Sequence, residues 1–144
     1  MPGTVTSLVT TIFVYIAYEH LGYTDLKFSI IFFTLLFFYS FYAVKDAESE
    51  FKNKDPRQIV IDEVLGQAMP LILVLHLSQN NQLSLPIEVY YVLSFIFFRF
   101  FDILKPFPVS YFDKNFKNYF GIIMDDIMAG LYSMILIYLI SLKF

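Results

Sequence analysis

Cysteine is absent from this chain of 144 residues. Its absence excludes disulfide bonds, a thiolate nucleophile, and zinc or iron–sulfur sites that need cysteine ligands. An excess of positive charge is missing too: the formal net charge is −3, and no basic stripe with interleaved aromatic residues indicates nucleic-acid binding. The first residues lack a basic segment followed by an apolar core and a small-residue cleavage site, so we expect no cleaved signal peptide.

Hydrophobic residues, by contrast, are abundant. They make up 58% of the chain, with 18 phenylalanines among them, and the mean hydropathy is +0.62. Average apolar usage in soluble domains is about 45–50%, and a domain of this length has too little interior to bury the surplus. We therefore predict a single membrane-embedded domain over residues 1–144 with an all-α fold, a polytopic bundle of about five helices.

The expected helices correspond to five apolar stretches, and local signals extend one of them. Asp55 is a good N-cap with Pro56 at the first helical position, so the third helix is predicted to start there and to run to about Leu77. Pro70 lies inside this helix and predicts a kink. The five stretches are Val5–Tyr18, Phe28–Val44, Val64–Leu77, Pro86–Phe101 and Ile122–Leu142.

Other signals set the ends of the remaining helices. Gly22 is a plausible stop for the first helix. The second helix is predicted to start after Thr24 and to continue into water through Glu48. Pro106 and Pro108 are predicted to end the fourth helix, because proline cannot continue the hydrogen-bond ladder.

Lysine and arginine are unevenly distributed between the two ends of such a bundle. With the N-terminus inside and five crossings, only Lys27 and Lys143 fall on the outer side, which the positive-inside rule favours. A re-entrant third segment is the main alternative, and it would put loops 45–62 and 102–120 on opposite sides. The inner set is Lys45, Lys52, Lys54, Arg57, Arg99, Lys105, Lys114 and Lys117.

Acidic residues stand where hydrocarbon is expected. Asp125 and Asp126 lie inside the apolar stretch Gly121–Leu142, and Asp62 and Glu63 open another such stretch. An ionised side chain at the centre of a membrane helix costs roughly 2.5–3.5 kcal/mol on insertion scales, so such residues are rare without a function. Small residues follow one turn later on both helices and allow close approach of a neighbour. The two acidic pairs are therefore expected to face each other.

A third charged segment, Arg99-Phe-Phe-Asp102-Ile-Leu-Lys105-Pro106-Phe-Pro108, ends the fourth stretch. The guanidinium of Arg99 and the ammonium of Lys105 both suit phosphoryl oxygens. If this segment meets the acidic pairs, five carboxylates would repel one another unless a cation binds. Ligands that are all oxygen favour a hard ion such as Mg²⁺ or Mn²⁺. The candidate metal ligands are Asp62, Glu63, Asp102, Asp125 and Asp126.

Each of these features also has an interpretation without catalysis. Acids in the first turns of a helix are stabilised by the helix dipole, and Arg99 and Lys105 could be anchors at the membrane interface. Thr4, Ser7 and Thr11 share a helical face, where hydroxyl bonds to the preceding turn are commoner than contacts with a phosphate. Such unrelated causes would not place the intramembrane charges on one side, which favours a shared site.

The residues that several known kinds of phosphate-transfer enzyme require are absent from this sequence. The sequence has no D-x-D-x-T/V motif for an aspartyl phosphate, no Cys-x5-Arg loop, and no D-G-x2-A-R run. His20 and His76 are both expected on the outer side, away from the acids. Metal-assisted hydrolysis remains, in which an ion screens and orients the phosphate and activates water.

Three segments and the opening of the chain carry a family resemblance: Val60-Ile61-Asp62-Glu63-Val64-Leu65-Gly66, Phe98-Arg99-Phe100-Phe101-Asp102-Ile103-Leu104-Lys105-Pro106-Phe107-Pro108, Asp125-Asp126-Ile127-Met128-Ala129-Gly130, and Pro2-Gly3-Thr4. In this order they resemble bacterial phosphatidylglycerophosphatase A, with Thr6 where that family usually has glycine. The resemblance implies an all-helical, Mg²⁺-dependent enzyme. It would remove the terminal phosphate of phosphatidylglycerophosphate, giving phosphatidylglycerol and inorganic phosphate.

The leading hypothesis is therefore a lipid phosphatase in the bacterial inner membrane, with its active site at the cytoplasmic edge and a phospholipid as its substrate. The alternative is a membrane carrier of cations or protons that uses the intramembrane acids. A non-catalytic scaffold would explain the hydrophobicity but would leave the acids unexplained. In the leading hypothesis the catalytic residues are Asp102, Asp126 and Glu63, and the phosphate-binding residues are Arg99, Lys105 and Thr4.

Overall fold

The computed structural model describes residues 2–22, 25–50, 60–115 and 119–143, and every secondary-structure element in these ranges is a helix. This confirms the all-α class. Six helices are present in the described ranges, where about five were expected. They are α1 (Pro2–Glu19), α2 (Leu26–Glu50), α3 (Ile61–Gln79), α4 (Ile87–Leu104), α5 (Val109–Asn115) and α6 (Tyr119–Lys143).

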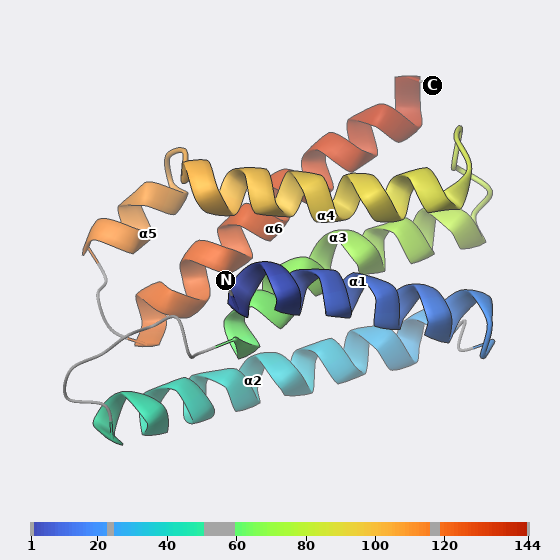
Figure 1. The fold of residues 1–144 in the computed structure, drawn as a ribbon. Coiled ribbons are helices and arrows are strands. Elements are labelled where there is room, and N and C mark those ends of the chain that lie inside the picture. Colours follow the sequence, from blue (N-terminus) through green and yellow to red (C-terminus); the bar gives the residue numbers. More distant parts are fainter. Residues whose placement is uncertain (1, 23–24, 51–59, 116–118, 144) are drawn as a thin grey trace.

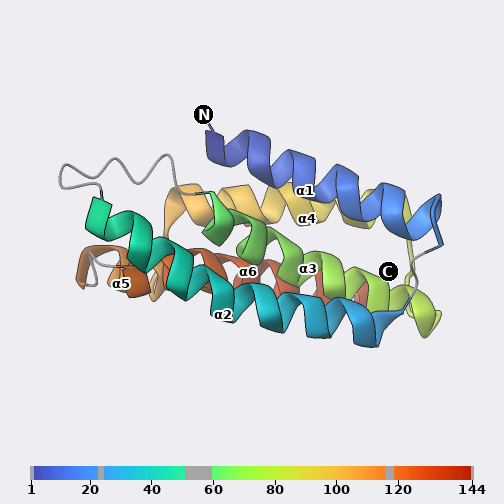
Figure 2. The same cartoon turned by 90° about the horizontal axis from the view of Figure 1, so that it is seen from below.

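Helix α3 forms the centre of the bundle. The other four long helices, α1, α2, α4 and α6, all pack against it, and they run along one another with α2 and α4 on opposite flanks (Figure 1). Seen from below, α1 and α2 lie on different sides of α3 (Figure 2). Leu65, Leu71 and Val74 of α3 are fully buried. The hydrophobic surface of the chain is therefore divided between a core built on α3 and an outer face.

The outer face of the bundle is strongly apolar. Phe28, Phe32 and Leu35 of α2, for example, are each more than half exposed, which is typical of a surface that faces lipid tails rather than water. Among the described residues, three helical segments are long and apolar enough to cross a membrane. These segments are Leu26–Asp46, Ile61–Gln79 and Ile123–Lys143. The chain is therefore a helical membrane protein, and the expectation of five crossings stays a prediction for α1 and α4.

The end of α4 follows from its sequence, whereas α5 was not predicted. Lys105 adopts a left-handed backbone conformation with φ of 48°, and its N–H donates to the carbonyl of Phe101 at 2.9 Å. Pro106 then prevents continuation of the helix. After Pro108 the chain turns back into the short helix α5, which packs on α6. Its seven residues are too few for a periodic sequence signal, and the segment was expected to be part of the loop over residues 102–120.

The predicted start of α3, at Asp55 and Pro56, lies outside the described residues. Within them α3 begins at Ile61, with Val60 at the N-cap position. The consequence is that Asp62 and Glu63 stand in the first turn of α3, where free backbone N–H groups and the helix dipole favour negative charge. Pro70 lies within α3 as expected, and the kink stays a prediction.

Glycines allow α3 and α6 to cross at close range. A Cβ atom added to Gly130 would lie 2.5 Å from the carbonyl oxygen of Gly66, and one added to Gly66 would lie 2.6 Å from the carbonyl oxygen of Asp126. These two oxygen atoms belong to the backbone, which cannot rotate away, and a Cβ on Gly66 would also lie 2.5 Å from the ring of Phe98. This close approach was predicted from the small residues that follow each acidic pair, and it brings the two pairs together.

We expect Gly130→Ala to separate α3 from α6. The added methyl group must push one backbone away from the other, and such overpacking lowers the free energy of unfolding by about 1–3 kcal/mol. Unfolding of the purified protein in detergent measures the loss. Leu139→Val, an apolar change at a half-exposed position on the same helix, is the control. Equal stability of Gly130→Ala and the wild type would show that the crossing is looser than described.

Candidate functional site

The charged segments meet at one end of the bundle. The starts of α1 and α3, the end of α4, α5 and the first half of α6 all lie at this end in both views (Figures 1 and 2). Arg99 of α4 contacts Glu63 of α3, and Lys105 contacts Asp125 of α6. The start of α3, the end of α4 and the first half of α6 therefore lie at the same end of the bundle, as predicted. Helix α3 runs from this end to the other, so a re-entrant path for the third segment is not observed.

Three carboxylates form the buried centre of this site. Asp62, Asp125 and Asp126 are only 6%, 8% and 3% exposed, and each offers an oxygen within 4.8 Å of the others. The carboxyl groups of Asp62 and Asp126 are in hydrogen-bonding contact. The second oxygen of Asp62, Oδ1, is buried without a hydrogen-bond partner among the described residues. Three buried acids at this spacing form an arrangement that a cation would stabilise.

Asp125 and Asp126 are both buried although they diverge around α6. Asp126 lies on the side of α6 that contacts α3, next to Asp62. Asp125 is covered from another side by Lys105, whose Nζ donates to its Oδ2 at 3.2 Å. Both aspartates of the pair can therefore belong to one site, because α6 packs against α3, α4 and α5 at this level.

The remaining two acids are held by an arginine. One terminal nitrogen of Arg99, Nη1, lies 3.0 Å from Oε2 of Glu63 and 2.8 Å from Oδ2 of Asp102. The three side chains are between 11% and 18% exposed. Asp102 also makes a hydrogen-bonding contact with Asp126, so the Arg99 cluster and the three-aspartate centre are continuous. Arg99 was predicted to bind phosphate, and here its guanidinium is engaged by two carboxylates.

Helix α1 contributes to the site through its first two turns. The backbone of Gly3 touches the carboxylate of Glu63 so closely that a side chain there would collide with it, and the hydroxyl of Ser7 is in hydrogen-bonding contact with Glu63. The single proton of the Ser7 hydroxyl is directed to the carbonyl of Gly3 at 3.0 Å, with the Glu63 carboxylate as its alternative acceptor, and the hydroxyl of Thr11 donates to the carbonyl of Ser7 at 2.9 Å. The expected bonds to the preceding turn are thus confirmed for Ser7 and Thr11.

Sequence reasoning weighed Thr4, Ser7 and Thr11 for contact with a phosphate, but it did not predict that Gly3 and Ser7 contact Glu63. Their spacing of four residues, continued by Thr11, is a small-residue pattern that favours close helix packing and could have indicated them. The described contacts of α1 with the acids run through Gly3 and Ser7, whereas Thr4 lies half-buried beside them. A phosphate contact by Thr4 stays a prediction.

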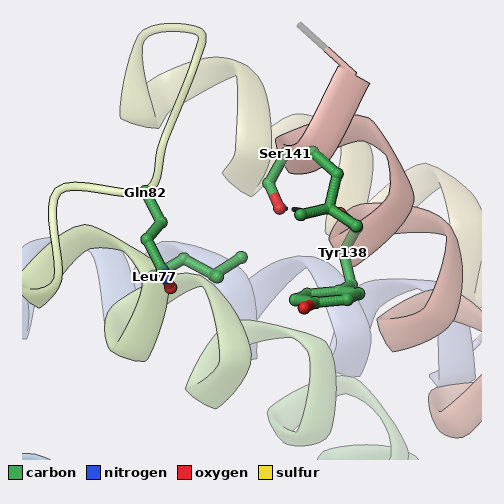
Figure 3. A pocket seen from close by; sticks show the side chains of 5 residues that line it. Leu77, Gln82, Tyr138 and Ser141 are labelled. Atoms are coloured by element: carbon green, nitrogen blue, oxygen red, sulfur yellow. Dashed lines mark hydrogen bonds between the residues drawn. The ribbon is translucent and has the colours of Figure 1, made fainter.

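A separate pocket opens at the other end of the bundle. It lies where α3 and α6 end, between the loop after α3 and the last turns of α6 (Figure 3). None of the residues that line it is acidic or basic, so they provide neither ligands for a metal ion nor a positive charge for a phosphate. Its lining residues are Leu77, Gln82, Tyr138, Ser141 and Leu142.

Comparisons with known proteins point to one family. The family model described as phosphatidylglycerophosphatase A matches residues 1–141. A protein of Haemophilus influenzae with the name phosphatidylglycerophosphatase A is 36% identical over 100 residues, which cover 69% of this chain and 56% of the relative. A Bacteroides thetaiotaomicron protein named putative phosphatidylinositol-3-phosphatase is 40% identical over 84 residues, covering 58% of this chain and 48% of that protein.

A third relative extends the comparison, and its match is shorter. The Escherichia coli phosphatidylglycerophosphatase A is 43% identical over 47 residues, 33% of this chain and 27% of its own length. The aligned segments thus span about half or less of the curated relatives. No solved structure gives a significant match. Since the family model covers nearly the whole sequence, this chain belongs to the phosphatidylglycerophosphatase A family.

Proposed function

We propose that the protein is a lipid phosphatase that removes the terminal phosphate of phosphatidylglycerophosphate, leaving phosphatidylglycerol and inorganic phosphate. Family membership and the names of two relatives support this reaction. The observation that carries the proposal is the placement of three buried aspartates beside a lysine and an arginine at one end of the bundle. This combination provides ligands for a cation and positive charge for a phosphate.

The residues of the centre fit a divalent cation such as Mg²⁺. Asp62, Asp125 and Asp126 supply only oxygen donors, which suit a hard ion. Oδ1 of Asp62, which has no hydrogen-bond partner in the described part of the chain, supports this, because a buried carboxylate oxygen without a partner is costly unless something binds it. Asp102 contacts Asp126 and could complete the ligand set. When bound, the ion would offset the charge of the phosphate and lower the pKa of a coordinated water.

Two cationic side chains are available to hold the phosphate group. Lys105 is about one third exposed and reaches over Asp125, so its ammonium can contact a phosphoryl oxygen at the mouth of the site. Arg99 presents five N–H donors, of which the Nη1 group serves Glu63 and Asp102. We propose that its remaining terminal donors contact the phosphate while the carboxylates keep the guanidinium in place. The hydroxyl of Thr4 is a further candidate.

The acids would also position the attacking water. The water oxygen forms a bond to phosphorus while the bond from phosphorus to the glycerol oxygen breaks, and the leaving oxygen takes up a proton. We assign the acceptor of the water proton to Glu63, Asp102 or Asp126, since Asp126 belongs to the centre and Glu63 and Asp102 lie beside it. Their connection through Arg99 and Asp102 holds them in fixed geometry, which is the requirement for an efficient proton acceptor.

We further propose that this end of the bundle faces the cytoplasm in the bacterial inner membrane. The excess of lysine and arginine expected at this side supports the orientation. Among the described residues, Arg99, Lys105 and Lys114 all lie at this end, whereas Lys27 and Lys143 lie at the other. A phosphate on a lipid headgroup would reach the site at the level of the membrane surface.

Phosphate release from the purified protein tests the proposal and the effect of metal removal. We expect release from phosphatidylglycerophosphate with Mg²⁺, a loss to background with EDTA, and recovery when excess Mg²⁺ is added. Phosphatidic acid and phosphatidylinositol 3-phosphate are the comparison substrates, and we expect slower release from both. Absence of release from every lipid, together with cation flux in liposomes without phosphorylated lipid, would instead favour the cation-carrier alternative.

A further inference from the structure

Gln67 is a buried polar side chain to which neither the family comparison nor the acidic site gives a role. It lies one helical turn after Glu63 on α3, and it is fully buried. Neither its amide nitrogen nor its amide oxygen has a hydrogen-bond partner among the described residues. A primary amide in the apolar interior of a bundle is strongly unfavourable unless its donors and acceptor are satisfied.

The register between α1 and α3 shows what Gln67 faces. The two helices run in the same direction (Figures 1 and 2), with Gly3 against Glu63 at one end and Tyr18 bonded to Ser78 at the other. Both pairs are separated by the same 60 positions. Because equal steps along two parallel helices cover equal lengths, this register places Gln67 level with Ser7.

The surroundings of Gln67 are polar toward the site and apolar on the far side. Ser7 and Thr11 of α1 are buried, and their hydroxyls already donate to carbonyls of their own helix. Each hydroxyl oxygen therefore keeps the capacity to accept a hydrogen bond. One turn further along α3, Leu71 packs with Tyr15 and other apolar side chains. On this face of α3 the polar side chains therefore extend from Glu63 to Gln67 and stop before Leu71.

We propose that Gln67 binds a buried water molecule between α1 and α3, and that this water restrains the carboxylate of Glu63. A water molecule is the smallest group that both donates and accepts hydrogen bonds, and buried waters usually make about three bonds to polar groups that would otherwise be unsatisfied. Gln67 supplies two such groups, and the oxygens of Ser7 and Glu63, within one helical turn, can accept further hydrogen bonds. Gln67 is then a positioning residue that acts through Glu63. This last step rests on the proposed function, whereas the water site does not.

Solid-state NMR tests the water site directly. In liposomes without any phosphorylated lipid, we expect magnetisation to pass from water to the side-chain amide of Gln67 and not to the methyl groups of Leu71. Because substrate is absent, a signal cannot come from a lipid hydroxyl group of the substrate. No transfer from water to Gln67 would overturn the proposal, whatever the activity of the protein.

The variant Gln67→Met tests the positioning role, since methionine has a similar shape and no hydrogen-bonding amide. We expect kcat to fall about tenfold, KM for the lipid to stay unchanged, and the thermal midpoint not to rise. The matched control Leu71→Met should leave kcat unchanged. A rise in the thermal midpoint with kcat unchanged would show that the amide was only an unsatisfied group, and would overturn the proposal. If the wild type releases no phosphate at all, the proposed function fails while the NMR result still decides the water site.

Discussion

Asp126→Asn is expected to reduce phosphate release by about 10³-fold, within the range for loss of an acid–base group. Asp126 is 3% exposed and contacts both Asp62 and Asp102. Asparagine keeps the size of the side chain but removes one oxygen ligand and the negative charge. Both the binding of a cation and the acceptance of a proton should therefore suffer.

Folding must be unaffected for this result to be informative. We expect Asp126→Asn to insert into the membrane and to be at least as stable as the wild type, because it removes one charge from a group of mutually repelling acids. Glu88→Gln is the control, since Glu88 is exposed at the start of α4, at the other end of the bundle. Full turnover by Asp126→Asn would remove the α6 pair from the mechanism.

Arg99→Met is expected to affect stability as well as activity. Arg99 lies between Glu63 and Asp102, and all three side chains are largely buried. Removing the cation leaves two carboxylates close together without compensation, and breaking a buried ion pair in this way typically costs about 3–5 kcal/mol. Unfolding in detergent measures the stability, and phosphate release should fall together with it because the two acids lose their fixed positions.

A second substitution separates the electrostatic effect from simple loss of packing. Arg99→Met combined with Glu63→Gln removes one of the two uncompensated charges, so the double variant should be more stable than Arg99→Met alone while staying inactive. Lys27→Met, at an exposed position on the opposite end, should leave both properties unchanged. If the double variant is less stable than both Arg99→Met and Glu63→Gln, then Arg99 does not stabilise the protein by compensating the charge of Glu63.

Local signals in the sequence predicted most helix ends. α2 runs from Leu26 to Glu50, in line with the start expected after Thr24 and the extension through Glu48. Pro106 ends α4 as expected. The helix start expected at Asp55 and Pro56 lies outside the described residues and stays a prediction. Within the described residues α3 begins at Ile61, where its first turn meets Gly3 of α1.

The sequence predicted which charged residues come together, but not which of them form ion pairs. All five acids expected from the sequence lie in one connected cluster with Arg99 and Lys105. Which carboxylate pairs with which cation was not predictable, because it depends on how α4 and α6 rotate about their axes. A role for α1 was expected through Thr4, but the contacts of Gly3 and Ser7 with Glu63 were not predicted for the same reason: a glycine and a serine carry no charge pattern, and only the register with α3 brings them to Glu63.

The central claim is that carboxylates from distant parts of the chain bind one shared divalent cation. Titration of the detergent-solubilised protein with Mn²⁺, followed by electron paramagnetic resonance, measures this binding without any substrate. We predict a saturable site in the wild type and the loss of that same site in Asp62→Asn on α3 and, separately, in Asp126→Asn on α6. Undiminished Mn²⁺ binding in both variants would contradict the account.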